Sequence, residues 1–138
     1  MEEKLKVIEA FAGIGSQAMA LRNINVNHEI IGISEWEVNA IISYDAIHTD
    51  DNVDYTTGRT KQEILSELNH YTFSTDGKSP CDITKLKESL IRRLYNANKR
   101  TKNLGSIVDN HNFPPCDLLT YSFPCQDISV AGKDVGYE

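Results

Sequence analysis

The sequence predicts an α/β protein with a mostly parallel, doubly wound sheet that is cut off after about its fourth strand. Apolar runs at residues 5–9, 29–33 and 116–120 are typical of buried strands, and helical patterns alternate with them. Such alternation indicates a parallel sheet with right-handed crossovers. A glycine-containing turn directly after the first run supports the same fold, because glycine permits a tight passage from strand to helix.

The elements up to residue 49 are expected in a regular order. The glycine turn opens a first helix, Ser16–Asn23, and the second apolar run leads to a second helix, Val38–His48. The buried face of this second helix is expected to carry four side chains: Val38, Ile41, Ile42 and Ala46.

The segment 50–80 breaks this rhythm and is expected to be a surface insertion. Its Asp-Asp, Thr-Thr-Gly and Asp-Gly-Lys-Ser-Pro clusters are loop signals. Within it, Thr60 and Glu63 form a capping box that opens a short helix. The apolar side of that helix would consist of Ile64, Leu65 and Leu68. Residues 81–84 then predict a brief third strand, or its end.

A basic segment follows at residues 85–102, in a chain whose net charge is −6. Only Glu88 opposes its seven positive charges: Lys85, Lys87, Arg92, Arg93, Lys99, Arg100 and Lys102. Apolar residues recur at helical spacing: Leu86, Leu90, Ile91, Leu94 and Tyr95. The pattern predicts an amphipathic helix on the sheet, with the charges forming a solvated face. Contact with phosphates is the alternative, although the net charge has the wrong sign for gripping DNA unaided.

Composition indicates one small globular domain of 138 residues. No apolar stretch approaches the roughly 20 residues that span a membrane, and no basic-then-apolar leader is present, so a cytoplasmic protein is expected. Three cysteines, an odd number without short spacing, argue against a disulfide framework. Zinc ligands could in principle come from Cys81, Cys116 and Cys125 with His70 or His111. No metal site is expected, because the sequence has no Cys-x-x-Cys pair.

The turn Phe11-Ala12-Gly13-Ile14-Gly15 has the features of a nucleotide-binding loop. Gly13-x-Gly15-x-x-Ala18 fits the general fingerprint, and free N–H groups are expected to face a ligand there. Glu35 follows about twenty positions later, where its carboxylate could accept both hydroxyls of a ribose. Trp36, the only tryptophan, could lie flat against an adenine. Half-buried packing is the alternative for Trp36.

A cysteine lies just beyond the last apolar run, in Tyr121-Ser122-Phe123-Pro124-Cys125-Gln126. In open α/β sheets, chemistry collects outside the carboxyl ends of the strands, which makes Cys125 a candidate nucleophile. The alternative is a structural cysteine, since free cysteine is often buried.

Four segments, in this order, resemble the first four motifs of the DNA (cytosine-5)-methyltransferases. They are Phe11-Ala12-Gly13-Ile14-Gly15, Ser34-Glu35-Trp36-Glu37, Cys81-Asp82-Ile83-Thr84 and Phe123-Pro124-Cys125-Gln126. The sequence departs from the family pattern at Ser122, where glycine is common, and it stops at Glu138, before the later motifs. The resemblance implies a Rossmann-like S-adenosylmethionine-dependent methyltransferase fold. Residues 1–138 would be the amino-terminal portion of the catalytic domain, without the target-recognition region.

The resemblance also implies a cofactor, S-adenosyl-L-methionine, and no metal. The expected pocket consists of Phe11, Ala12, Gly13, Ile14, Gly15, Glu35, Trp36, Asp82, Ile83 and Pro124. Asp82 would accept a hydrogen bond from the adenine amino group and the Ile83 N–H would donate to the ring. A helix N-terminal charge is the alternative for Asp82.

Cys125 would be the catalytic residue, attacking carbon 6 of a cytosine so that carbon 5 becomes nucleophilic. Because a base inside a duplex is out of reach, the cytosine would be flipped out. The tail resembles the family's loop that closes over DNA, and its expected DNA-binding residues are Gln126, Ser129, Gly132 and Lys133.

The resulting function is a DNA (cytosine-5)-methyltransferase of a bacterial restriction–modification system, nucleoid-associated and with double-stranded DNA as partner. An RNA methyltransferase of the same chemistry and, more remotely, an NAD-dependent oxidoreductase are the alternatives. The chain alone is expected to be inactive, because the family's later motifs are absent. An exposed sheet edge at Leu118, Leu119 and Tyr121 favours self-association or a complementing carboxyl-terminal polypeptide.

Overall fold

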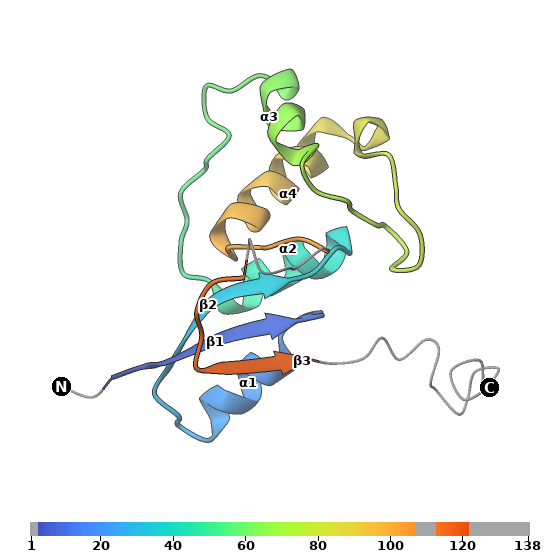
Figure 1. Ribbon diagram of the computed structural model, residues 1–138. Helices are drawn as coiled ribbons and strands as arrows, with labels where there is room; N and C mark the ends of the chain where they lie inside the picture. The colour runs from blue at the N-terminus through green and yellow to red at the C-terminus, as the bar shows by residue number, and fades with distance from the viewer. Residues whose placement is uncertain (1–2, 107–112, 122–138) are drawn as a thin grey trace, which may run out of the picture.

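The computed structural model describes residues 3–106 and 113–121. In these residues three strands form a parallel sheet in the order β2–β1–β3 (Figure 1). The strands are β1 (Leu5–Ala10), β2 (His28–Ser34) and β3 (Leu118–Tyr121). The parallel α/β arrangement predicted from the sequence is confirmed.

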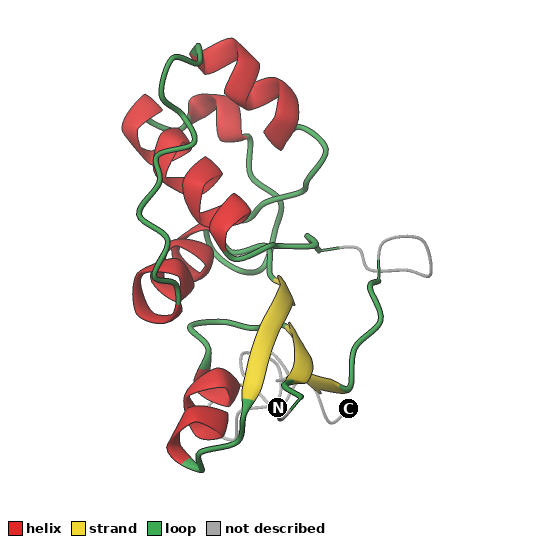
Figure 2. Ribbon diagram, turned by 90° about the vertical axis from the view of Figure 1, so that its left-hand side faces the viewer, coloured by secondary structure: helices red, strands yellow, loops and turns green. Residues whose placement is uncertain are grey.

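The first two helices lie on the same face of the sheet (Figure 2). α1 spans Ser16–Asn23 and α2 spans Val38–His48, both with the predicted bounds. The side chain of Glu9, on β1, hydrogen-bonds to both helices. On α2, Val38 and Ile41 are buried as expected, but Ala46 is exposed and Tyr44 is buried in its place.

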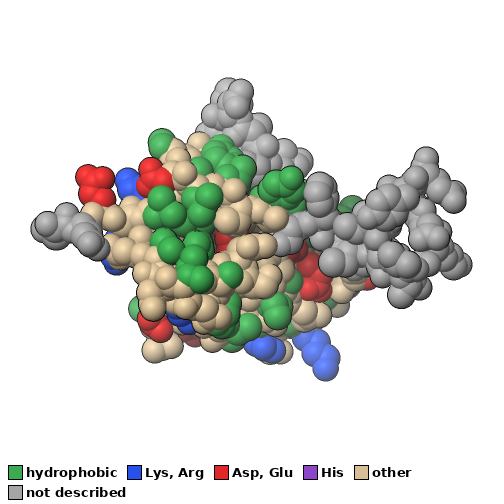
Figure 3. Space-filling view, turned by 90° about the horizontal axis from the view of Figure 1, so that it is seen from below, with side chains coloured by type: hydrophobic (Ala, Val, Ile, Leu, Met, Phe, Trp, Pro, Cys, Tyr) green, Lys and Arg blue, Asp and Glu red, His purple; other side chains and the backbone are tan. Residues whose placement is uncertain are grey.

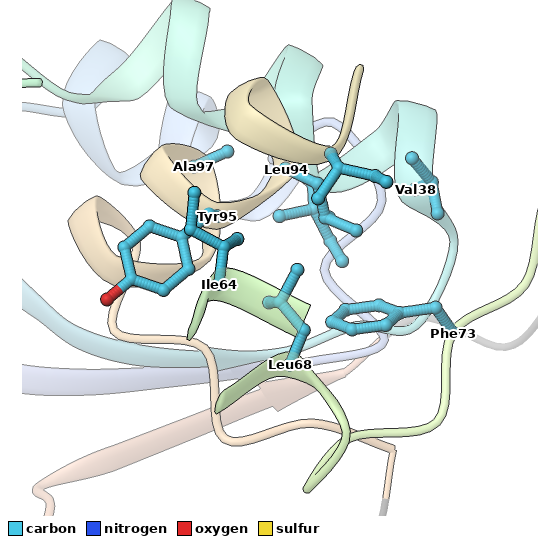
Figure 4. Packing of buried hydrophobic residues seen from close by; sticks show 9 residues of the cluster. Val38, Ile64, Leu68, Phe73, Leu94, Tyr95 and Ala97 are labelled. Carbon is cyan, nitrogen blue, oxygen red and sulfur yellow. The ribbon is translucent and has the colours of Figure 1, made fainter. Parts of the chain in front are cut away.

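The main hydrophobic core lies between helices and not against the sheet. α4 (Glu88–Arg100) packs on both α2 and α3 (Lys61–Leu68), and Figure 4 shows apolar side chains of these helices meeting. Its buried members are Val38, Ile41, Ile64, Leu68, Phe73, Ile91, Leu94, Tyr95 and Ala97. α4 was expected on the sheet, and its principal partners are instead α2 and α3.

The segment 50–80 is not merely a surface feature, because it supplies Ile64, Leu68 and Phe73 to this core. The capping box of Thr60 and Glu63 is confirmed at the start of α3. Apolar side chains on one side of α3 drive this burial, since the helix can cover them only by packing on α4.

Two arginines of α4 also hold this segment, so the predicted solvated face is wrong for them. Arg92 donates to the carbonyl oxygens of Thr56 and Arg59 at 3.1 and 3.0 Å. Arg100 donates to the carbonyl oxygen of Val53 at 2.7 Å and pairs with Asp45 at 3.0 Å.

The predicted third strand at residues 81–84 is wrong, because a short 3-10 helix, Ile83–Lys85, begins there. Asp82 accepts a hydrogen bond from the Thr84 N–H and so closes a turn that competes with extended backbone. The strand predicted at residues 116–120 is therefore the third, and it lies slightly later in the chain.

Apolar side chains remain exposed around β3 and α1. β3 is an edge of the three-stranded sheet, and Leu119 and Tyr121 are 47% and 55% exposed. Ile14, Met19 and Ile24 are exposed as well. Figure 3 shows hydrophobic side chains gathered on the underside of the molecule. None of the helices in the described ranges is long and apolar enough to cross a membrane.

Candidate cofactor site

The turn between β1 and α1 has an unusual backbone. Phe11, Gly13 and Gly15 all adopt left-handed φ angles, of 52°, 56° and 87°. An aromatic residue in this region is an outlier, and such residues cluster at functional sites. The Phe11 side chain is 52% exposed, so burial of the ring does not explain the conformation.

The two glycines of the turn serve different purposes. A Cβ on Gly13 would meet nothing within 4 Å, so open space lies beside this residue. A Cβ on Gly15 would lie 2.1 Å from Nε2 of His48 and 2.8 Å from Cε2 of Tyr44. Gly15 therefore allows the turn to pack on α2, whereas Gly13 leaves room for a ligand.

Glu35 joins this turn to the end of β2. Its Oε1 accepts from the Gly13 N–H at 2.8 Å, and its Oε2 accepts from the N–H groups of Trp36 and Glu37, both at 2.9 Å. The Gly13 N–H, expected to face a ligand, is thus already bonded. A carboxylate offers about four acceptor positions, so three bonds leave capacity for a further donor.

The third family-like segment, Cys81-Asp82-Ile83-Thr84, is connected to the second, Ser34-Glu35-Trp36-Glu37, through backbone hydrogen bonds of Phe73 and Ser74. The Ser74 N–H donates to the Trp36 carbonyl, and the Cys81 N–H donates to the Phe73 carbonyl, each at 2.8 Å. Trp36 is half-buried, which suits both the adenine contact and the packing alternative.

Asp82 is exposed, and its Oδ1 accepts from the N–H and the hydroxyl of Thr84 at 3.0 and 2.6 Å. These hydrogen bonds hold the pKa of Asp82 below its usual value. Asp82 therefore lies at the start of the 3-10 helix, as the alternative for this residue stated. Adenine recognition by Asp82 and Ile83 stays a prediction.

Sequence reasoning missed a buried carboxylate behind the turn. Glu9 is 1% exposed; its Oε1 accepts from the Ala18 N–H at 3.0 Å and its Oε2 accepts from the Tyr44 hydroxyl. Burial, together with the bond to Glu9, raises the pKa of Tyr44. A glutamate within the apolar run 5–9 was the available signal. Glu9 fixes the start of α1, where a negative charge is favourable.

The remaining predicted site residues lie outside the described ranges: Pro124, Cys125, Gln126, Ser129, Gly132 and Lys133. The other two cysteines, Cys81 and Cys116, are half-buried and free. Burial raises the pKa of Cys81, which makes its thiol a poorer nucleophile. No cluster of three potential metal ligands exists within residues 3–106 and 113–121.

Comparison with known proteins identifies the family. The profile of the C-5 cytosine-specific DNA methylases matches residues 68–138, which is just over half of the chain. The chain belongs to this family. The match includes the segment Phe123-Pro124-Cys125-Gln126.

Two bacterial relatives and one from a phage are similar along nearly the whole chain. Type II methyltransferase M2.ScrFI of Lactococcus lactis subsp. cremoris is 42% identical over 137 residues, which are 96% of this chain and 38% of the relative. Orphan methyltransferase M.SssI of Spiroplasma monobiae is 37% identical, covering 97% of this chain and 37% of the relative. Orphan methyltransferase M.SPBetaI of Bacillus phage SPbeta is 35% identical, covering 98% and 20%. The chain thus spans well under half the length of these relatives.

Proposed function

We propose that this chain is the cofactor-binding, amino-terminal part of a DNA (cytosine-5)-methyltransferase that uses S-adenosyl-L-methionine. The observation that carries the proposal is the hydrogen bond between Gly13 and Glu35. It unites the glycine turn and the acidic residue, twenty-two positions apart, into one site at the carboxyl ends of β1 and β2. Family membership supports the methyltransferase and does not favour an oxidoreductase or an RNA enzyme.

The residues around this turn fit the chemistry of the cofactor. Glu35 keeps acceptor capacity for ribose hydroxyls, and the space beside Gly13 admits a ligand against the backbone. The exposed Phe11 ring and the half-buried Trp36 offer apolar surfaces for the rest of the molecule. When bound, S-adenosyl-L-methionine supplies an electrophilic methyl group.

Cys125 is proposed as the nucleophile. Tyr121, the last residue of β3, pairs with Ala10, which directly precedes the glycine turn. Cys125 is four positions after Tyr121 in the sequence, and four residues span at most about 14 Å, which supports its assignment to this edge of the sheet. Addition of its thiolate to carbon 6 of cytosine would make carbon 5 nucleophilic. Carbon 5 would take up the methyl group that S-adenosyl-L-methionine supplies, with S-adenosylhomocysteine as the leaving group. Loss of the carbon-5 proton and of the thiolate would then restore the aromatic ring.

The substrate proposed for the complete enzyme is double-stranded DNA, with cytosine flipped out of the helix, in a bacterial restriction–modification setting. Relatives named type II and orphan methyltransferases support this assignment. Their greater length and the exposed Leu119 and Tyr121 support a further proposal. A carboxyl-terminal polypeptide, or a second copy of this chain, covers β3, and the isolated chain does not methylate DNA.

Covalent trapping tests the proposal. This chain would be joined to the remaining part of a relative and incubated with 5-fluorocytosine DNA and S-adenosyl-L-methionine, and protein–DNA adducts would be counted on denaturing gels. The adduct should form with the parent sequence and disappear in Cys125→Ser. Cys81→Ser and Cys116→Ser are matched controls and should keep it. An adduct that persists in Cys125→Ser would refute the assignment.

A further inference from the structure

Asn103 lies just after α4, and its side chain holds the main chain of Glu35 at two points. Its Oδ1 accepts from the Glu35 N–H at 3.1 Å, and its Nδ2 donates to the Glu35 carbonyl oxygen at 3.0 Å. The same Oδ1 accepts from the Gly105 N–H at 3.1 Å, and Nδ2 also donates to Oδ1 of Asn98 at 2.7 Å. Asn103 is 5% exposed, and these four bonds use both donors and both acceptor positions of its amide.

The segment around Asn103 runs beside β2 on the side away from β1. Asn103 forms a parallel bridge with Ile33, and the Leu104 N–H donates to the Ile33 carbonyl at 2.8 Å. The Ser34 hydroxyl donates to the Gly105 carbonyl at 2.6 Å. The backbone bonds and the Ser34 hydroxyl fix the end of β2 as far as Ser34. Of the contacts from this segment, those of the Asn103 side chain fix the next residue, Glu35.

We propose that Asn103 is a positioning residue for ribose recognition, acting through Glu35. With its N–H and carbonyl both held, the Glu35 main chain is fixed on either side of Cα, and the carboxylate is directed at Gly13. Asn98, on α4, fixes the orientation of the Asn103 amide. Oδ1 of Asn98 can accept from Nδ2 of Asn103, whereas a flipped amide would turn Oδ1 of Asn103 toward it. The ribose part of this inference rests on the proposed function, whereas the hold on Gly13 does not.

The first test needs no cofactor. Amide hydrogen exchange at Gly13 would be measured by NMR in the whole 138-residue chain, for the parent sequence and for Asn103→Ala. Losing the Asn103 bonds should speed exchange at Gly13 by about tenfold or more, while the amides of Ile8 and Ile33 keep their rates. Thr101→Val is the control, since Thr101 is equally buried and its hydroxyl donates to the Ala97 carbonyl oxygen of α4 and not to Glu35.

Unchanged exchange at Gly13 in folded Asn103→Ala would overturn the inference. If Asn103→Ala does not fold, Asn103→Asp replaces it, because aspartate keeps the acceptor for the Glu35 N–H but replaces the Nδ2 donor with an oxygen that repels the Glu35 carbonyl oxygen. Faster Gly13 exchange is then expected, and parental exchange in that variant would equally overturn the inference.

The second test separates positioning from a purely structural role. Affinity would be measured for S-adenosylhomocysteine and for its 2′,3′-dideoxy analogue. Asn103→Ala should weaken the first by about tenfold and leave the second unchanged, and it should add little in a Glu35→Ala background. Equal weakening of both ligands would refute ribose positioning. If Asn103→Ala speeds exchange at Gly13 but the parent chain binds neither ligand, the proposed function is refuted, whereas the positioning of Glu35 by Asn103 is not.

Discussion

Gly13 and Gly15 share a left-handed backbone but differ in their surroundings, and alanine at the two positions should separate ligand binding from stability. The space beside Gly13 is open, whereas a Cβ at Gly15 would overlap His48 and Tyr44. His48 is partly exposed, and moving it would disturb the hydrogen bonds of its ring nitrogens with Arg22 and the Ile14 carbonyl oxygen. Tyr44 has little freedom to move, because it is 2% exposed and its hydroxyl is bonded to the buried Glu9.

The magnitudes follow from these two environments. The left-handed conformation costs a non-glycine residue about 1–2 kcal/mol, and this applies at both positions. At Gly15 the overlap adds about 1–3 kcal/mol, the usual range for an overpacked site. We therefore expect Gly13→Ala to lower the free energy of unfolding by about 1–2 kcal/mol and Gly15→Ala by about 2–5 kcal/mol.

Urea unfolding followed by circular dichroism checks the stabilities, and calorimetric titration with S-adenosylhomocysteine checks the affinities. Gly13→Ala should stay folded and lose affinity, since its methyl group occupies the space proposed for the ligand. A stability loss at Gly13 as large as that at Gly15 would refute the different roles assigned to the two glycines. So would parental affinity in folded Gly13→Ala.

Three further outcomes are expected. Tyr44→Phe should lower the free energy of unfolding by about 1–3 kcal/mol, because Glu9 loses a buried donor; an unchanged urea midpoint would contradict this. Arg100→Ala should cost about 1–3 kcal/mol through its partly buried pair with Asp45, whereas the exposed Arg93→Ala should change stability by less than about 0.5 kcal/mol; equal effects would contradict the role of the pair. Hydrogen bonds from Thr56 and Asn96 lower the pKa of Asp54 from 3.8 to about 2. The stability that this lowered pKa provides is therefore complete above the ordinary pKa and lost as the pH falls from about 4 through 2, so the melting temperature should fall over that window, and less steeply in Asp54→Asn.

The sequence predicted the parts of the fold that depend on local signals. α1 and α2 have the expected bounds, and the capping box of Thr60 and Glu63 opens α3. The third strand predicted at residues 81–84 was wrong, since the Asp82 carboxylate accepts hydrogen bonds from the N–H and the hydroxyl of Thr84 and so favours a turn over extended backbone.

The long-range packing partners of the helices could not be predicted from the sequence, because periodicity does not say which surface an amphipathic face will contact. α4 has the expected apolar stripe, yet that stripe packs on α2 and α3. The arginines Arg92 and Arg100 were assigned to solvent for the same reason, although their acceptors are backbone carbonyls some 33–47 positions away.

In the candidate site, residue types pointed to Gly13 and Glu35, but no spacing rule gives the bond between them. Glu9 and Asn103 were missed altogether. Each is a polar residue whose role appears only when strands and helices distant in sequence are brought together.

Calorimetric titration of the chain with S-adenosylhomocysteine and, separately, with NADH tests the central claim most directly. Both ligands carry an adenosine, so the comparison isolates what the site adds beyond nucleotide recognition. We predict binding of S-adenosylhomocysteine, no measurable binding of NADH, and a loss of about 1–3 kcal/mol in Glu35→Ala. Preference for NADH, or parental affinity in a folded Glu35→Ala variant, would contradict the account.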